Sequence, residues 1–257
     1  MISSTSNSRI KYIMNLKKSA RARRQQEHFL VEGPRMFFEV PKDRLQEIYV
    51  TESFEEKYKD KLSDCRYEKI SDAVCRHLSD TKTPQGVIAL VKKKEISLQE
   101  ILYGQENPCL FLLENLQDPG NMGTIIRTSE GAGVNGIIIS RESVDPYNPK
   151  VIRSTMGAIF RVPFVIVDDM EETLRILKDA GICTYAAHLN GEAFYQQDYR
   201  KGCAFFIGNE GNGLSEQLTS RADRRIRIPM KGQVESLNAA VAATVLMYEA
   251  LRQREWV

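Results

Sequence analysis

The sequence lacks the short motifs that mark several common enzyme classes. It contains no G-x-x-x-x-G-K-[ST] segment, so a loop that cradles the phosphates of a nucleoside triphosphate is not indicated. It also has no G-x-S-x-G, the nucleophile elbow of an α/β-hydrolase. One G-x-G-x-x-G match occurs at residues 131–136, but it closes a predicted helix and leads into the strand-like run GIIIS. The dinucleotide-binding fingerprint needs the opposite order, so a nicotinamide or flavin site is not favoured.

Cysteines are few, and their spacing does not indicate a metal site. The five cysteines include no C-x-x-C pair, and Cys75 with His77 is too isolated to indicate bound zinc. The N-terminus has no apolar core of signal-peptide length, and the longest apolar run, residues 239–251, is too short to span a bilayer. We therefore expect a protein of the reducing cytoplasm, with no metal and no contact with a membrane.

Composition indicates a folded globular chain. At 257 residues, with 42% hydrophobic and 27% charged residues, it has room for one large domain or two of ordinary size. The formal net charge of +2 says little about partners, but its distribution says more. Against the single acid Glu27, the first 28 residues hold seven cations: Arg9, Lys11, Lys17, Lys18, Arg21, Arg23 and Arg24. Such a run either attracts a polyanion, most often nucleic acid, or is the solvated face of a helix.

The N-terminal third is predicted to form a binding unit. Residues 1–27 are expected to form a basic helix or arm, because apolar residues recur at helical spacing within 6–27. Residues 28–93 then alternate short strand-like and helix-like runs, which is typical of a compact α/β domain. This domain carries few chemically reactive groups, so we interpret it as a substrate-binding domain. Residues 94–108 are predicted to be a linker, and residues 109–257 a second domain.

The second domain shows the pattern of a doubly wound sheet. The predicted strands are 109–115, 136–140, 162–167, 182–188, 203–208 and 224–229. The predicted helices are 123–133, 148–159, 171–181, 213–222 and 235–254. The run CLFLLEN is apolar throughout, as expected of a strand buried on both faces. The alternation predicts an α/β fold with a mostly parallel sheet covered on both sides.

Polar residues gather after three of these strands. After the first, Asp118-Pro-Gly turns the chain, Asn121 can cap the next helix, and Arg127 follows one and a half turns later. An arginine near a helix start can hold a phosphate, although a capped helix with a surface arginine explains the segment equally well. Gly/Asn-rich residues 208–213 and the turn after residue 229 bring backbone groups within reach of a ligand. In open α/β sheets ligands bind at such strand ends.

Taken together, these segments resemble a known family. N-x-G-T-I-I-R-T at 121–128, I-G-N-E-G-x-G-L at 207–214 and I-P-M-x-G-x-x-E-S-L-N-A-A-V-A at 228–242 match the three motifs of the SpoU (TrmH-like) RNA ribose 2′-O-methyltransferases of the SPOUT superfamily. The resemblance covers residues 109–254, in order and at the expected spacing. FLVEGPRMFFEV and TPQGVIALV look like the small ribosomal-protein-like domain that many members carry upstream.

The resemblance implies a fold, a cofactor and an assembly. The sheet would carry a deep C-terminal trefoil knot that binds S-adenosyl-L-methionine, and the enzyme would be a homodimer in which Arg127 can serve the partner's site. By motif match, the cofactor-binding residues would be Gly208, Asn209, Glu210, Ile228, Pro229, Met230, Leu237 and Asn238. The catalytic residues would be Asn121, Arg127, Glu210, Ser236 and Asn238. Because arginine stays protonated, we assign Arg127 to the adjacent phosphate and to developing alkoxide charge.

The reaction expected from the resemblance is methyl transfer to a ribose 2′-hydroxyl of structured RNA. The RNA expected is 23S ribosomal RNA, because the upstream domain resembles that of large-subunit RNA methyltransferases, and transfer RNA is the alternative. An inactive RNA-binding protein with a degenerate knot would bind no cofactor, and the presence of all five catalytic residues argues against it. A base methyltransferase of a related knotted family fits the cofactor site but not the Asn/Arg and Ser-Leu-Asn motifs. Glu210 either positions Asn121 or Arg127, or assists removal of the proton.

Overall fold

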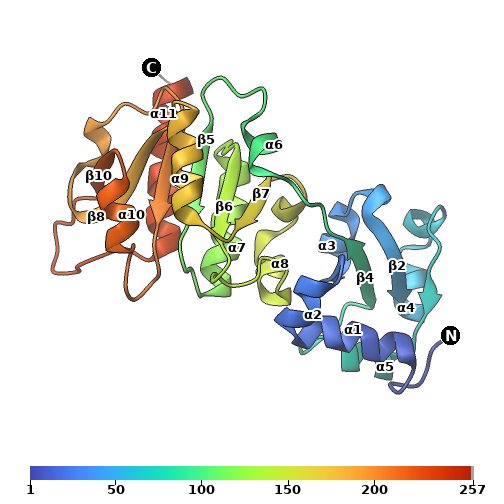
Figure 1. The fold of residues 1–257 in the computed structure, drawn as a ribbon. Coiled ribbons are helices and arrows are strands. Elements are labelled where there is room, and N and C mark those ends of the chain that lie inside the picture. The colour runs from blue at the N-terminus through green and yellow to red at the C-terminus, as the bar shows by residue number, and fades with distance from the viewer. Residues whose placement is uncertain (256–257) are drawn as a thin grey trace. The chain divides into compact units, whose positions relative to one another are not determined.

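The computed structural model describes residues 1–255, and the chain divides into two compact units (Figure 1). Unit 1 contains residues 1–94 together with 145–160, and unit 2 contains the rest. The chain therefore leaves the second unit after Val144 and returns to it at Arg161. No helix among residues 1–255 is both long enough and apolar enough to cross a lipid bilayer.

Unit 1 is built on a four-stranded sheet in the order β1-β4-β2-β3, in which only β2 and β3 run parallel. The strands are β1 (His28–Glu32), β2 (Leu45–Val50), β3 (Glu68–Lys69) and β4 (Val87–Lys92). The helices are α1 (Ser8–Lys18), α2 (Ala20–Gln25), α3 (Pro34–Glu39), α4 (Glu52–Lys57), α5 (Asp72–Leu78) and α8 (Pro149–Thr155). Three short 3-10 turns complete it: η1 (Lys42–Arg44), η2 (Lys59–Leu62) and η3 (Ala158–Phe160).

Helix α1 belongs to the core of unit 1. Asn7 accepts a hydrogen bond from the backbone N–H of Arg9 and so caps the helix start. The apolar face of α1 is formed by Ile10, Ile13 and Leu16, all fully buried against residues of α5 and β4. The basic residues of the N-terminal run are therefore placed around a helix whose other face is fixed by packing.

A buried ion pair joins the N-terminal helices to the 145–160 segment. Arg23, only 3% exposed, donates from Nε to Oδ2 of Asp145 at 2.5 Å. It also donates to the backbone carbonyls of Leu16 and Lys17, at 2.8 and 3.0 Å. The other oxygen of Asp145 accepts the backbone N–H of Tyr147. Because Arg23 is paired with a carboxylate and also donates to two backbone carbonyls, its charge can stay buried; removing either partner leaves an uncompensated charge.

Unit 2 is a six-stranded sheet in the order β10-β8-β9-β5-β6-β7, with every neighbouring pair parallel. The strands are β5 (Cys109–Leu113), β6 (Gly136–Ser140), β7 (Phe164–Val167), β8 (Cys183–Ala193), β9 (Cys203–Ile207) and β10 (Arg224–Arg227). The helices are α6 (Leu98–Leu102), α7 (Pro119–Gly131), α9 (Met170–Asp179), α10 (Glu216–Arg221) and α11 (Ala239–Glu255), with the short turn η4 (Phe194–Gln196). The predicted mostly parallel α/β fold is confirmed.

Helices cover both faces of this sheet. Leu112 and Phe206 pack in one cluster with Leu177 of α9 and Leu218 of α10. The alternate residues Phe111 and Phe205 stack on the other face, where α7 packs against α11 and α11 packs against β9. Strands β5, β6 and β9 are buried at every position, as their continuously apolar sequences predict.

Several predicted boundaries are wrong: the strand predicted at 182–188 continues to Ala193, and the helix predicted at 148–159 ends at Thr155. Two other boundaries, both helix starts, are set by capping side chains. The last helix begins at Ala239 and not at residue 235, because the Asn238 side chain caps it by accepting the backbone N–H groups of Ala240 and Val241. The helix predicted from residue 123 begins earlier, at Pro119, because Asp118 caps it by accepting the N–H of Asn121. Pro119 suits the first helical position, where its missing N–H has no intrahelical partner.

Strand β8 extends beyond the predicted 182–188 and contains a wide bulge. In its pairing with β10, Arg225 faces Ala186 whereas the next residue, Ile226, faces Glu192. The five residues 187–191 of β8 therefore lie between two consecutive pairs of the β8–β10 register and have no partner in β10. Gly191 is required there, because a Cβ atom at that position would lie 2.5 Å from the backbone nitrogen of Ile226.

Replacing Asp145 by asparagine should strongly destabilise the protein, because Arg23 would keep its charge in a buried position. Breaking such a pair typically costs about 3–5 kcal/mol, which urea denaturation would measure. Asp168→Asn is the matched control: Asp168 and Arg141 are joined at the same 2.5 Å, but the Asp168 side chain is 75% exposed against 7% for Asp145. The control should cost no more than about 1 kcal/mol. Equal effects of the two substitutions would contradict the role given to burial.

Candidate active site

A cavity of about 570 Å³ lies at the carboxyl ends of β8, β9 and β10 in unit 2. Its walls are the bulge residues 187–189, the loop 207–214 and parts of the segment 226–239. Ala242 and Leu246 of α11 complete the lining. A volume of this size is typical of a site for a small molecule, and the carboxyl edge is where parallel sheets bind ligands.

The loop after β9 is closed on itself by backbone hydrogen bonds. Asn209 and Gly213 exchange two N–H···O bonds, at 3.0 and 2.9 Å. The Asn209 side chain accepts the N–H groups of Gly211 and Asn212 and donates to the carbonyl of Asn115 at 2.8 Å. A Cβ atom on Gly208 would lie 2.2 Å from the backbone carbon of Gly213, so only glycine permits this closure.

The segment after β10 supplies an apolar wall. Ile228, Met230 and Leu237 are half-buried and line the cavity, whereas Glu235 and Ser236 are exposed at its edge. The cavity thus combines an apolar surface with a rim of backbone and side-chain polar groups. That combination suits a ligand with a flat apolar ring and a polar or charged tail.

One hydrogen-bonded chain joins the three polar segments beside the cavity. The amide nitrogen of Asn238 donates to Oδ1 of Asn121, and the amide nitrogen of Asn121 donates to Oε1 of Glu210, each at 2.9 Å. Glu210 also accepts the backbone N–H groups of Gln117 and Asp118, at 3.0 and 2.9 Å. Because Asn121 offers its carbonyl to one segment and its amide to another, its side chain sets the positions of both.

The same contacts set the charge state of Glu210. Burial by itself favours the neutral carboxyl, but the hydrogen bonds from Asn121, Gln117 and Asp118 outweigh it and lower the pKa of Glu210 below its ordinary value. The group is therefore a carboxylate at neutral pH. A carboxylate that already accepts three hydrogen bonds is better suited to holding neighbouring groups than to taking up a proton.

Most of the sequence-predicted residues meet at this cavity. Those that line it are Gly208, Asn209, Glu210, Ile228, Met230, Ser236, Leu237 and Asn238. Pro229 lies between two lining residues but is not itself part of the wall, and Asn121 reaches the site through its hydrogen bonds. Arg127 does not join them: it is exposed on α7, and no other described residue bonds or pairs with its side chain.

The sequence motifs did not include three contributors. Asn115, which adopts a left-handed conformation with φ of 53°, presents its carbonyl to Asn209. His188 and Leu189 enter the cavity wall from the β8 bulge, and the His188 ring accepts the N–H of Asn190 at 3.2 Å. The only available signal was the glycine at 191 within a strand pattern, which indicates a bulge. Among residues 1–255 no group of three or more His, Cys, Asp or Glu side chains is placed to hold a metal ion.

Comparison with known proteins identifies the family. The model of the SpoU rRNA Methylase family matches residues 108–248. This chain belongs to that family. A second model, the MRM3-like substrate binding domain, matches residues 7–89.

Similar SpoU proteins include several named for ribosomal RNA. The chain is 36% identical over 175 residues to the 23S rRNA (guanosine-2′-O-)-methyltransferase RlmB of Bordetella pertussis, covering 66% of this chain and 71% of that protein. It is 33% identical over 180 residues to the 23S rRNA (guanosine(2553)-2′-O)-methyltransferase RlmP of Bacillus subtilis, covering 70% of each.

Solved SpoU structures match nearly the whole chain. The AdoMet-bound rRNA methyltransferase from Sinorhizobium meliloti has a TM-score of 0.86 at 29% identity, covering 98% of this chain and 97% of that one. The SpoU methyltransferase AviRb from Streptomyces viridochromogenes has a TM-score of 0.85 at 28% identity, with 96% and 98% covered.

Glu210→Gln should lower the melting temperature at neutral pH, because the amide nitrogen of glutamine cannot accept a hydrogen bond and so leaves at least one of the three donors to Glu210 without an acceptor. The pKa of Glu210 is depressed in the folded state, so its stabilisation is full above the ordinary carboxyl pKa and is lost as pH falls through the folded value. The melting-temperature difference between wild type and variant should therefore shrink on acidification from pH 7 toward the folded pKa. Glu235→Gln, at the exposed edge of the cavity, is the control and should show no such trend. A difference that does not change with pH would contradict the assignment.

Proposed function

We propose that this protein transfers the methyl group of S-adenosyl-L-methionine to a ribose 2′-hydroxyl of 23S ribosomal RNA. The observation that carries the proposal is the hydrogen-bonded chain from Glu210 through Asn121 to Asn238, which joins three family motifs at the edge of one cavity. The similar RlmB and RlmP proteins are named for this reaction on 23S rRNA. A similar structure from Sinorhizobium meliloti is described as AdoMet-bound.

The residues at the cavity fit S-adenosylmethionine. Its volume of about 570 Å³ is in the range of small-molecule sites, and its half-buried apolar wall suits an adenine ring. Gly208 keeps the loop closed where any side chain would collide with Gly213. The residues that would hold the cofactor are Gly208, Asn209, Glu210, Ile228, Pro229, Met230, Leu237 and Asn238. When bound, the sulfonium supplies an activated methyl group, so the protein's task is mainly to position a hydroxyl for in-line attack.

The polar residues beside the cavity have different roles in positioning the hydroxyl. Asn121 and Asn238 are fixed by hydrogen bonds, and Ser236 is exposed at the cavity edge, so all three can orient a ribose. Glu210 acts as a positioning residue, because three donors already occupy its oxygens and its pKa is lowered, which weakens it as a base. Arg127 holds the phosphate next to the reacting ribose and stabilises alkoxide charge, since a guanidinium offers several N–H donors to an anion.

Arg127→Ala should abolish methyl transfer while leaving cofactor affinity largely unchanged, because Arg127 does not line the cavity and its side chain bonds to no other residue among 1–255. The assay is transfer of labelled methyl to 23S ribosomal RNA from cells without the gene, with transfer RNA as the comparison substrate. Calorimetry with S-adenosylhomocysteine measures cofactor-site binding independently. Arg175→Ala, an exposed arginine on α9, is the control and should keep full activity. Normal turnover of the Arg127 variant would remove it from the mechanism.

The assembly we propose is a homodimer formed through α7 and α11. Val241 and Tyr248, seven residues apart on α11, are each 48% exposed. They lie on a helix that packs against α7, and the Tyr248 hydroxyl lies 3.4 Å from where a Cβ atom on Gly131 would be. A second copy covering this face would bury the exposed apolar residues. It would also bring Arg127 of α7, which bonds to no other residue among 1–255, to the active site of that second copy.

Val241→Asp combined with Tyr248→Asp should convert the dimer to a monomer and abolish methyl transfer, because two charges would be buried at the interface. Sedimentation equilibrium measures the mass, and circular dichroism checks that the variant stays folded. Tyr103→Asp is the control, since Tyr103 is a single aromatic residue, 87% exposed, elsewhere in unit 2. A wild-type protein that sediments as a monomer, or a double variant that stays dimeric and active, would refute this interface.

The proposal also includes the domain boundaries, the C-terminal knot and the cellular location. Residues 1–27, which form the two helices α1 and α2, would bind RNA together with residues 28–93; 94–108 would be a linker and 109–257 the methyltransferase domain. The two matched family models support the separation of the RNA-binding part from the methyltransferase domain, whereas residues 145–160 pack with unit 1. The C-terminal trefoil knot is part of the same proposal and rests on membership of the SpoU family. We place the enzyme in the cytoplasm, which fits five cysteines that are all free.

A further inference from the structure

A stripe of exposed cations runs along the N-terminal helices of unit 1. The face of α1 opposite its buried residues presents Lys11, Asn15 and Lys18, at the i, i+4, i+7 spacing of one helix face, and all three are exposed. Arg21, on α2, is exposed as well. We refer to Lys11, Lys18 and Arg21 as the basic stripe.

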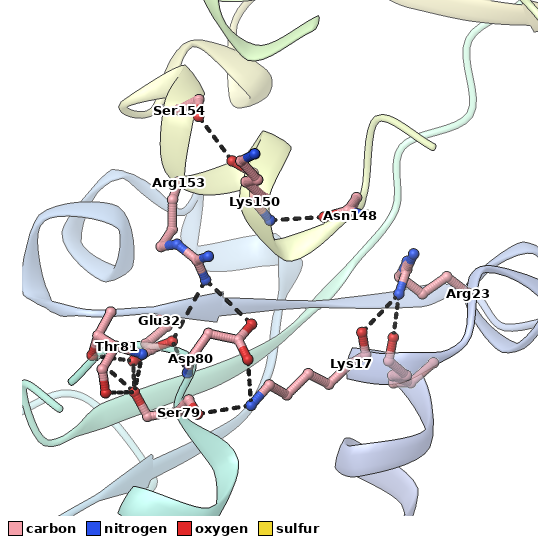
Figure 2. A network of polar contacts seen from close by, with 11 residues as sticks. Lys17, Arg23, Glu32, Ser79, Asp80, Thr81, Asn148, Lys150, Arg153 and Ser154 are labelled. Carbon is pink, nitrogen blue, oxygen red and sulfur yellow. Dashed lines mark hydrogen bonds and ion pairs between the residues drawn. The ribbon is translucent and has the colours of Figure 1, made fainter. Parts of the chain in front are cut away.

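The basic stripe differs from the neighbouring cations in having no partners. Lys17 pairs with Asp80 at 2.7 Å and donates to the carbonyl of Ser79 (Figure 2). Arg153 approaches Asp80 and Glu32, so the acids on this side of unit 1 are already neutralised (Figure 2). By contrast, no other residue among 1–255 forms a side-chain hydrogen bond or ion pair with Lys11, Lys18 or Arg21. Residues 1–26 contain no acid at all, so the positive charge of the stripe is uncompensated.

Helix stability does not explain these cations. A lysine in the last turn of a helix interacts favourably with the helix dipole, which accounts for Lys18. Lys11, however, is in the first half of α1, and Arg21 is in the first turn of α2, where the dipole disfavours a positive charge. Packing does not require them either, because both side chains are exposed. The fold therefore does not use the charges of Lys11 and Arg21, which stay available to a partner outside the chain.

We propose that Lys11, Lys18 and Arg21 bind the phosphate backbone of the RNA substrate. The inference rests on the proposed function, and it assigns the RNA contact to one face of α1 and α2. Exposed, unpaired Lys and Arg side chains without neighbouring acids are the groups that neutralise phosphates and release their counterions. Contacts of this kind orient the RNA but do not read its bases. The stripe thus supplies affinity, and the choice of nucleotide is left to other residues.

The test is the triple variant Lys11→Gln, Lys18→Gln, Arg21→Gln, compared with Lys57→Gln, Lys59→Gln, Lys61→Gln. The control removes the same number of charges from an exposed segment of unit 1 that also contains Glu52, Glu55, Glu56 and Asp60. RNA affinity is measured by filter binding of a 23S ribosomal RNA fragment across a salt series. The stripe variant should bind at least tenfold more weakly at about 0.15 M salt, and its log–log salt slope should fall by about two, since each phosphate contact contributes about 0.7–0.9.

The stripe variant should keep wild-type affinity for S-adenosylhomocysteine, and its KM for RNA should rise while kcat at saturating RNA is unchanged. A loss of fold would lower cofactor affinity and kcat as well. A rise in KM for RNA at unchanged kcat and cofactor affinity therefore shows that RNA binding, and not folding, was weakened. Unchanged affinity and salt slope, or an equal loss in the Lys57/Lys59/Lys61 control, would overturn the proposal. If the wild-type protein binds RNA through the basic stripe but transfers no methyl group, the proposed function is refuted while the RNA-binding role of the basic stripe still holds.

Discussion

The Asn121 side chain is the point on which the candidate site depends. Its carbonyl accepts from Asn238 at the start of α11, and its amide donates to Glu210 in the loop after β9. Asn121 itself is held by the turn before α7, where Asp118 caps the helix. No apolar residue could take this position, because one side chain must act as donor and acceptor at the same time. The cavity wall is therefore held together by polar contacts with fixed directions.

The closure of the loop after β9 depends on a steric constraint that complements this polar one. Gly208 allows the backbone of Gly213 to approach within a distance that any Cβ atom would block, and the Asn209 side chain then ties the loop to Asn115. In the β8 bulge, Gly191 permits an equally close approach to Ile226. Both glycines permit close backbone approaches in segments that form the cavity, and Ile228, Met230 and Leu237 provide its apolar surface.

The lysine and arginine side chains of unit 1 differ in burial and in pairing. Arg23 is enclosed and paired, Lys17 and Arg153 are engaged with acids, and the basic stripe is left facing solvent. The positively charged side chains of unit 1 therefore have three different roles. Pairing decides which of them stabilise the fold and which keep positive charge available to a polyanion.

The sequence by itself determined the elements and the residues that carry the chemistry. Continuous apolar runs predicted the buried parallel strands, and family motifs placed Asn121, Glu210 and Asn238 in one site. It could not show that the Asn121 and Asn238 side chains meet, because they are 117 residues apart and meet only once the strand order is set. Local patterns also placed the start of the last helix too early, since its cap, Asn238, is oriented by its bond to Asn121. The tertiary structure alone decided that Arg23 is buried, that residues 187–191 bulge and that Arg127 bonds to no other residue in the described part of the chain. Each of these depends on groups distant in sequence, whose pairing no local propensity encodes.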